Sequence, residues 1–115
     1  MPDDHIDITD FTKVDMRAGT IVEVQQFPRA KKPSYKVRVD FGPEVGDRWS
    51  SVQAKTAYPD PQDLLGLTVV GVVNLKPRNI AGFSSEVLLL GVPGQDGELS
   101  LLVPGRGGQV GARVY

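Results

Sequence analysis

Residues 74–90 hold the side chains of this chain that are best suited to binding a ligand. The segment offers two cations, two amides and one aromatic ring: Lys76, Arg78, Asn74, Asn79 and Phe83. Cations bind phosphate or carboxylate groups, amides hydrogen-bond to bases or peptide backbone, and a ring stacks on a base or covers an apolar side chain. These groups suit a ligand with phosphates, bases or peptide bonds. They do not suit covalent catalysis, which needs an activated nucleophile.

Two apolar runs flank this segment and must position it. Residues 67–73 and 86–92 are rich in Leu and Val, which predicts two buried strands joined by a polar connection. Functional side chains often lie on such connections, because the strands hold them in place. Gly71 interrupts the first run, which predicts a bulge or a bend at that position.

The clearest strand signal lies earlier, over residues 35–41, where odd positions are apolar and even positions are charged. This alternation is typical of a half-buried strand. A short helix is predicted over residues 9–14, with Thr9 or Asp10 as its cap. Other elements follow from β-branched runs and turn residues: strands over 19–24, 48–54 and 99–103, a final strand or tail over 110–115, and a helical turn over 62–65.

Short strands separated by Gly- and Pro-rich turns, without a repeating strand–helix–strand pattern, predict an all-β fold. The chain has 115 residues, 13 Gly and 9 Pro. That length fits one five-stranded Greek-key OB-fold barrel with short helical pieces and extra terminal strands. Residues 1–8 are expected to form an acidic, mobile tail, and residues 9–115 the single domain.

Composition disfavours several classes of protein. The chain has no Cys, which excludes thiol catalysis and thiolate metal sites, and its one His lies in the acidic tail. Phosphate-loop, zinc-protease and serine-hydrolase motifs are absent. No apolar run approaches the ~20 residues of a membrane span, and the first residues lack a secretory signal. We therefore expect a cytoplasmic, non-enzymatic protein with no catalytic residue, metal, cofactor or membrane insertion.

Charge is distributed unevenly along the chain, although the net charge is −1. Residues 1–15 carry five Asp and one Lys, whereas residues 16–115 carry twelve Lys or Arg and nine Asp or Glu. Basic residues cluster over 29–38 and are interleaved with aromatic ones, which is typical of a nucleic-acid groove on an OB-type barrel. Alternatively, the aromatic residues fill the core. We expect this of Tyr35 and Phe41, leave both options open for Trp49, and expect Phe83 to be exposed.

Several motifs, in the same order along the chain, resemble the CsaA family. With x for positions outside the resemblance, they are DMRAGTIV at 15–22, FPxAxKPSYK at 27–36, DFG at 40–42, SSxQ at 50–53 and VNLKPRxIAGFxSEVL at 73–88. CsaA proteins are small, dimeric and described as export-related chaperones. The similarity runs from about residue 8 to the end. More distantly, the chain is similar to the tRNA-binding module appended to methionyl-tRNA synthetases, which shares the Asn-Leu-Lys-Pro pattern.

This resemblance implies an OB-fold barrel, a homodimer, tRNA binding through the barrel face, and binding of unfolded or preprotein segments. The positions that it marks as facing tRNA or peptide are Arg17, Lys36, Ser50, Ser51, Gln53, Asn74, Lys76, Arg78, Phe83, Ser85 and Glu86. The leading hypothesis is a non-catalytic, dimeric OB-fold protein with CsaA-like chaperone activity in protein export or unfolded-protein binding, and with tRNA-binding ability. The alternative is a dedicated tRNA-binding cofactor without a chaperone role.

RNA and peptide are expected to use the same groove. In the RNA interpretation, Lys36, Lys76 and Arg78 contact phosphates while Phe83 stacks on a base. In the peptide interpretation, an apolar side chain packs against Phe83. The chain departs from the family pattern at residues 51–54, where Ser-Val-Gln-Ala replaces Ser-Ala-Gln-Ile. This exchange of apolar residues is expected to repack the core and leave Gln53 in place.

Overall fold

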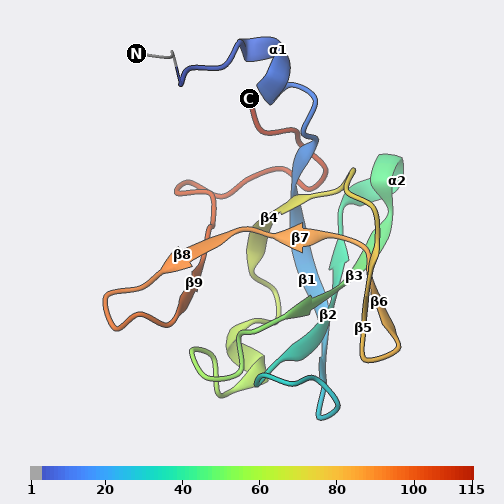
Figure 1. Cartoon of the computed structure of the whole chain (residues 1–115), viewed down its shortest axis with the longest axis vertical. Helices are drawn as coiled ribbons and strands as arrows, with labels where there is room; N and C mark the ends of the chain where they lie inside the picture. Colours follow the sequence, from blue (N-terminus) through green and yellow to red (C-terminus); the bar gives the residue numbers. More distant parts are fainter. Residues whose placement is uncertain (1–3) are drawn as a thin grey trace.

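The computed structural model describes residues 4–115 and forms a nearly closed, antiparallel, five-stranded barrel (Figure 1). Residues 1–3 of the predicted acidic tail lie outside the described residues. The order of the strands across the sheet is β3-β2-β1-β4-β7. The predicted all-β, OB-like class is confirmed. The barrel strands are β1 (Met16–Gln26), β2 (Tyr35–Asp40), β3 (Asp47–Val52), β4 (Thr68–Val72) and β7 (Leu88–Leu89).

Small elements decorate this barrel. They are α1 (Ile8–Phe11), α2 (Gly42–Val45), the 3-10 turn η1 (Pro61–Asp63), the hairpin β5 (Arg78–Ile80) and β6 (Phe83–Ser85), and the hairpin β8 (Gly91–Pro93) and β9 (Leu99–Leu101). The helical turns predicted over 9–14 and 62–65 exist. The predicted cap is wrong, because Asp7 precedes α1 and its N–H donates to Asp10 Oδ2 at 3.3 Å.

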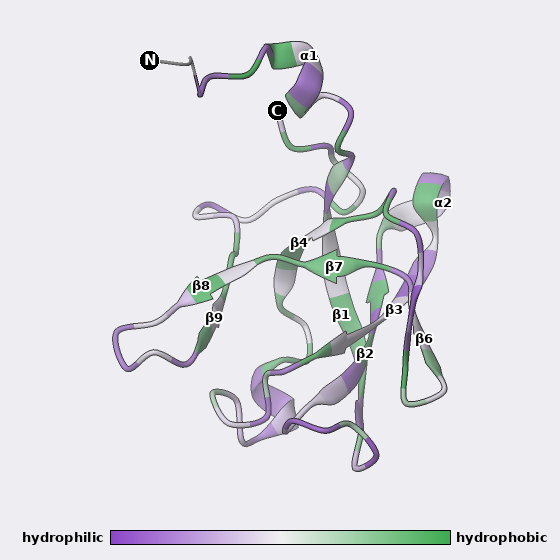
Figure 2. Ribbon diagram, viewed as in Figure 1, coloured by the Kyte–Doolittle hydropathy of each residue, from purple (hydrophilic) through white to green (hydrophobic). Residues whose placement is uncertain are grey.

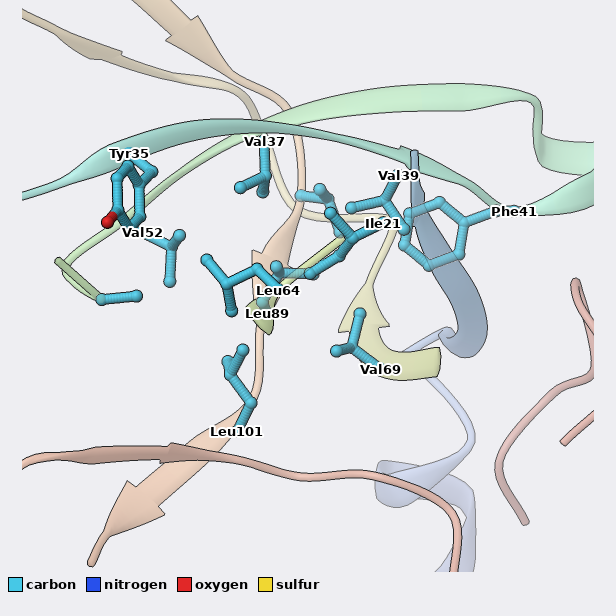
Figure 3. Packing of buried hydrophobic residues seen from close by; sticks show 12 residues of the cluster. Ile21, Tyr35, Val37, Val39, Phe41, Val52, Leu64, Val69, Leu89 and Leu101 are labelled. Atoms are coloured by element: carbon cyan, nitrogen blue, oxygen red, sulfur yellow. The ribbon is translucent and has the colours of Figure 1, made fainter. Parts of the chain in front are cut away.

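The core lies inside the barrel and follows the alternation predicted for residues 35–41. Tyr35, Val37, Val39 and Phe41 are all 0% exposed. Figure 3 shows Tyr35 and Phe41 at opposite ends of the apolar cluster. The Tyr35 hydroxyl donates to the Tyr58 carbonyl at 2.7 Å, so the buried hydroxyl group of Tyr35 has a hydrogen-bond partner.

Two strand glycines make room for the ring of Phe41. Of the bulge or bend predicted at Gly71, the bulge is wrong, because Gly71 pairs regularly with Arg17 and Leu89. A Cβ atom at Gly71 would lie 3.0 Å from Phe41 Cζ, and one at Gly19 would lie 2.6 Å from Phe41 Cδ1. The glycines therefore permit close approach of the aromatic ring, which is the other role of glycine in strands.

The second apolar run, predicted as one strand over 86–92, is divided between two sheets. The N–H of Leu90 donates to Val70 in the barrel at 2.9 Å, while its carbonyl accepts from Leu102 at 3.0 Å. The chain therefore leaves the barrel at Leu90 and enters the β8–β9 hairpin, which projects to one side in Figure 1.

The strand predicted over 110–115 is an irregular extension of the sheet along the beginning of β1. Ala18 donates to Ala112 at 2.9 Å, Gly111 donates to Ala18 at 2.8 Å, and Val114 donates to Met16 at 2.8 Å. In consequence β1 is paired along its length and is the central strand of the fold. Within residues 4–115, no helix has the length and hydropathy needed to cross a membrane.

Candidate ligand-binding site

The polar connection predicted between β4 and β7 is largely an ordered hairpin, β5–β6. Ala81 and Gly82 form its two-residue turn with φ values of 50° and 82°. Two successive left-handed residues are typical of a type I′ turn, in which glycine is favoured. The Asn79 carboxamide stabilises this turn by accepting the Gly82 N–H at 2.9 Å. The hairpin thus gives Arg78 and Phe83 fixed positions.

Beside this hairpin lies a shallow hollow of about 390 Å³ on the outer face of β1, β2 and β3. We call it the aromatic hollow. Alternation along β2 and β3 turns Lys36 and Trp49 outward, opposite to the core residues. The lining residues are Gln25, Lys36, Trp49, Phe83, Ser84 and Glu86.

Three aromatic rings and one cation form the base of the hollow. The Phe83 ring meets Phe27 edge-on at 5.5 Å between centroids and Trp49 at 6.3 Å. Lys36 Nζ lies 4.8 Å from the Phe27 centroid and 5.0 Å from that of Phe83. Phe83 is therefore half-buried, and the expectation of a freely exposed ring is wrong. Trp49, for which both options were open, is a half-buried wall of the hollow.

Another outward-facing cation on β2 is already neutralised. Arg38 Nε lies 3.0 Å from Glu23 Oε1, and its Nη1 lies 2.5 Å from Asp47 Oδ2. The hydrogen bonds from Gln25 and Arg38 hold the pKa of Glu23 below its ordinary value. Lys36 lies over the rings of Phe27 and Phe83 and makes no ion pair with another described residue, so it is the better placed of the two β2 cations to attract an anionic ligand.

Ser85 and Glu86, both predicted to face a ligand, close the barrel against β3. Glu86 donates its N–H to the Trp49 carbonyl at 2.8 Å and accepts the Trp49 N–H on Oε1 at 3.0 Å. The Ser85 hydroxyl oxygen accepts the Ser51 N–H at 3.1 Å. Ser50 is 1% exposed and faces the barrel interior. These polar groups hold the site together.

A larger groove of about 920 Å³ opens at one end of the barrel, and we call it the basic groove. Its walls come from the β1–β2 loop, the end of β3, the β5–β6 hairpin and the β8–β9 turn. Figure 2 shows the β1–β2 loop as hydrophilic and β7 as hydrophobic. Four cations and one carboxylate are among the lining residues, above a floor of apolar side chains: Arg29, Lys31, Lys32, Arg78 and Glu98, with Val52, Leu88, Leu89 and Leu99.

Three predicted site residues, Ser51, Gln53 and Arg78, line the basic groove, and three others, Lys36, Phe83 and Glu86, line the aromatic hollow. The β5–β6 hairpin contributes to both and separates them. In the altered 51–54 sequence, Val52 and Ala54 are buried and Gln53 is exposed. Lys76 is exposed and lines neither cavity.

Arg17 and Asn74 lie apart from both cavities and anchor the N-terminal segment. The Arg17 guanidinium donates to Asp15 at 2.6 Å and to the Gly111 carbonyl at 3.1 Å. The Asn74 carboxamide accepts the Asp15 N–H at 2.9 Å and donates to the Lys13 carbonyl at 2.8 Å. The hydrogen bond from Arg17 lowers the pKa of Asp15 from its ordinary value, against an opposing effect of burial.

Some site residues were not among the sequence-predicted set. The cluster of Arg29, Lys31 and Lys32 was visible as a basic run, but its distance in sequence from residue 78 concealed that both line one groove. Gln25 and Leu99 carried no signal at all. Within residues 4–115, no cluster of three or more His, Cys, Asp or Glu side chains is arranged to hold a metal ion.

The family model described as putative tRNA binding domain matches residues 16–113. Among curated relatives, the methionine–tRNA ligase of Pyrococcus abyssi is 39% identical over 111 residues. That of Methanocaldococcus jannaschii is 34% identical over 111 residues. The matches cover 96% of this chain but only 14% and 16% of the two ligases. The chain therefore spans about one seventh of the length of these relatives.

Solved structures of similar length also match. The CsaA chaperone protein of Picrophilus torridus has a TM-score of 0.89 and 41% identity, covering 96% of this chain and 100% of that one. The chaperone CsaA of Bacillus anthracis has a TM-score of 0.87 and 37% identity, covering 96% and 99%. A MetRS-related protein of Pyrococcus horikoshii has a TM-score of 0.84 and 31% identity, covering 98% and 100%.

Proposed function

This chain belongs to the family of putative tRNA-binding domains and to its CsaA group, and we propose that it binds tRNA through the aromatic hollow and the basic groove. One observation carries the proposal. The β5–β6 hairpin places Arg78 in a groove with three more cations and Phe83 in a hollow with Trp49 and Lys36. Cations that follow a phosphate backbone beside aromatic rings suit single-stranded parts of a folded RNA.

The cations and the rings have different roles in this proposal. Arg29, Lys31, Lys32 and Arg78 contact phosphates, which gives affinity and positions the RNA without reading its sequence. Trp49, on the other side of the β5–β6 hairpin in the aromatic hollow, is a half-buried ring on which a splayed base stacks. Because the net charge is −1, attraction depends on this local cluster of cations rather than on the charge of the whole protein.

Titration with bulk tRNA tests this assignment, since Trp49 is the one Trp of the chain and lines the hollow. We expect the fluorescence emission of Trp49 to change as tRNA is added, until binding is saturated. If three or four phosphates are neutralised, log affinity should fall against log salt with a slope of about −2 to −3. Absence of binding, or an affinity that does not respond to salt, contradicts the proposal. If the anisotropy of labelled tRNA shows binding but the Trp49 emission stays constant, the RNA binds away from the aromatic hollow.

We further propose a CsaA-like chaperone role, in which the protein binds unfolded or preprotein segments in the cytoplasm without catalysis. The floor of the basic groove supports this role, because Leu88 is 49% exposed there beside the buried Leu89. An RNA phosphate gains nothing from such apolar surface, whereas an extended peptide does. The alternative, a tRNA-binding cofactor without a chaperone role, leaves this floor unused.

A homodimer is the third part of the proposal, and exposed apolar side chains near α1 support it. Ile6 and Ile8 are 71% and 72% exposed, and Leu75 is 50% exposed directly after the anchoring Asn74. The sequence offers two apolar runs as candidates for the dimer surface, residues 67–75 and 99–103. The first lies mainly within the barrel, with Val69 at 0% exposed, and only its end at Leu75 is strongly exposed. Exposed apolar side chains at nearby positions, as at Ile6 and Ile8, make this end of the chain a candidate interaction surface.

Sedimentation velocity over a range of concentrations tests the dimer. We expect the wild type to sediment as a dimer and Ile8→Asp to shift the equilibrium toward monomer, because a charge in an apolar interface is costly to bury. Leu65→Asp is the matched control: it introduces the same charge at another exposed apolar side chain, 43% exposed, beside η1. A monomeric wild type, or equal dissociation of both variants, contradicts this surface.

A further inference from the structure

The aromatic hollow holds two opposite charges that are not paired with each other. Lys36 and Glu86 both line it, but within residues 4–115 they make no ion pair with each other. The Lys36 ammonium instead lies over the rings of Phe27 and Phe83. The Glu86 carboxylate accepts the Trp49 N–H on Oε1 at 3.0 Å. One cation and one carboxylate are therefore available to a ligand that enters the hollow.

Strand pairing sets the order of these groups across the outer face of the barrel. Gln25 on β1 pairs with Lys36 on β2. Trp49 on β3 is opposite Arg38, so it is a diagonal neighbour of Lys36, a separation that long and aromatic side chains can span. On the other edge of β3, Glu86 is hydrogen-bonded to Trp49 through its N–H and its carboxylate. The cation and the carboxylate thus approach the Trp49 ring from opposite edges of β3.

The Glu86 carboxylate is held in place and still has capacity to accept. A carboxylate offers about four acceptor positions, and the Trp49 N–H uses one of them. Among residues 4–115, no other group donates to this carboxylate. The side chain is half-buried, and hydrogen bonds to an ionised acceptor are stronger than those between neutral groups. A ligand that brings hydrogen-bond donors to this edge of the hollow therefore gains affinity.

The nucleobases differ in what they offer to such a carboxylate. Stacking on Trp49 does not distinguish them, because every base has a ring face. Recognition therefore depends on the groups at the edge of the base. Guanine has two adjacent donors, N1–H and the N2 amino group, next to the acceptor O6. Adenine and cytosine have an acceptor beside their amino group, and uracil has one donor between two acceptors. Lys is a usual partner of guanine O6.

We infer that the aromatic hollow is a guanine subsite: the base stacks on Trp49, donates its N1–H and N2–H to Glu86, and accepts from Lys36 on O6. The inference rests on the proposed binding of tRNA through this hollow. Lys36 is available for this role, because the four cations that contact phosphates lie in the basic groove. Only an unpaired guanine exposes these edge groups, so the subsite selects single-stranded parts of the RNA.

Two RNA ligands that differ by one amino group test the inference on the full chain. Each is a uridine oligonucleotide of about five residues, within the site size of an OB fold, with guanosine or inosine at its centre. Inosine keeps N1–H and O6 but lacks the N2 amino group. We expect the guanosine RNA to bind about tenfold more tightly, because inosine loses a hydrogen bond to a charged group. Titration followed by Trp49 emission measures both affinities.

Glu86→Gln separates base recognition from the structural role of this residue. The introduced amide oxygen can still accept the Trp49 N–H, but the charge and one acceptor oxygen are lost. We expect the preference for guanosine over inosine to fall to within about twofold. Asp63→Asn, at an exposed position in η1 that lines neither cavity, removes the same charge and should keep the preference. Circular dichroism of both variants confirms that the fold is retained.

Failure of the guanine subsite and failure of the proposed function give different results. If the wild type binds tRNA but binds the two oligonucleotides equally, or binds neither, the subsite is overturned and tRNA binding stands. A preference for guanosine that survives Glu86→Gln, even at lower overall affinity, shows that Glu86 only supports the structure and also overturns the inference. Lack of binding to tRNA by the wild type overturns the proposed function, and the subsite with it.

Discussion

Replacing Lys32 and Arg78 with Ala should weaken tRNA binding by roughly 10- to 100-fold at moderate salt and make the salt slope shallower by about two. The two cations reach the basic groove from different walls, the β1–β2 loop and β5, so their removal affects both sides. Each phosphate contact contributes about one unit to the slope, because it releases condensed counterions. Fluorescence titration against tRNA at several salt concentrations measures both quantities.

The matched control removes two cations that line neither cavity. Lys55 and Arg106 are both exposed, and the double replacement by Ala changes the net charge by the same amount. We expect its affinity to stay within about threefold of wild type, since charges beyond a Debye length of roughly 8–10 Å are screened. An equal loss in the two double variants would show that overall charge, and not the groove, determines binding.

Phe41→Ala should have the largest effect on stability, lowering the free energy of unfolding by about 3–5 kcal/mol. The ring is 0% exposed and packs between Gly19 and Gly71, positions without side chains that could fill the space. The cavity therefore has little means of collapsing, which is the condition for a high cost. Domains of this size have a free energy of unfolding of roughly 5–15 kcal/mol, so the substitution would remove a large part of the stability.

Urea denaturation followed by far-UV circular dichroism measures this loss. Val92→Ala removes two methyl groups from a side chain that is 49% exposed and should change the free energy of unfolding by about 0.5 kcal/mol or less. A loss of less than about 1 kcal/mol in Phe41→Ala would mean that the ring does not support the packing of β1 against β4.

The fold was predictable where a local pattern determines burial. Alternation over residues 35–41 identified β2 and its inner face, and the positions of Gly and Pro marked most turns. Gly71 was misinterpreted because its partner, the Phe41 ring, is distant in sequence. The division of residues 86–92 at Leu90 likewise depends on bonds to Val70 and Leu102, which no local pattern indicates.

The candidate site was predictable as chemistry but not as geometry. Cations and aromatic residues were recognised, yet the β1–β2 loop meets the β5–β6 hairpin only because the barrel closes. Hydrogen-bonding residues were the hardest to interpret, because Asn and Ser side chains hydrogen-bond equally well to a ligand or to the protein backbone. Asn74 hydrogen-bonds to the backbone of Lys13 and Asp15, and Ser85 accepts a hydrogen bond from the Ser51 N–H on β3. These partners are distant in sequence, so they could be identified only in the folded chain.

Pairing of residues 111–114 with the start of β1 also has a consequence for the order of folding. The Arg17–Gly111 contact joins positions 94 residues apart, and a loop of that length is slow to close because it carries a large entropic cost. During synthesis, β1 can pair with β2 and then β4, but its first residues must wait for residue 114 to emerge. In a nascent chain, this edge of the central strand therefore stays unpaired until residues 111–114 have been synthesised.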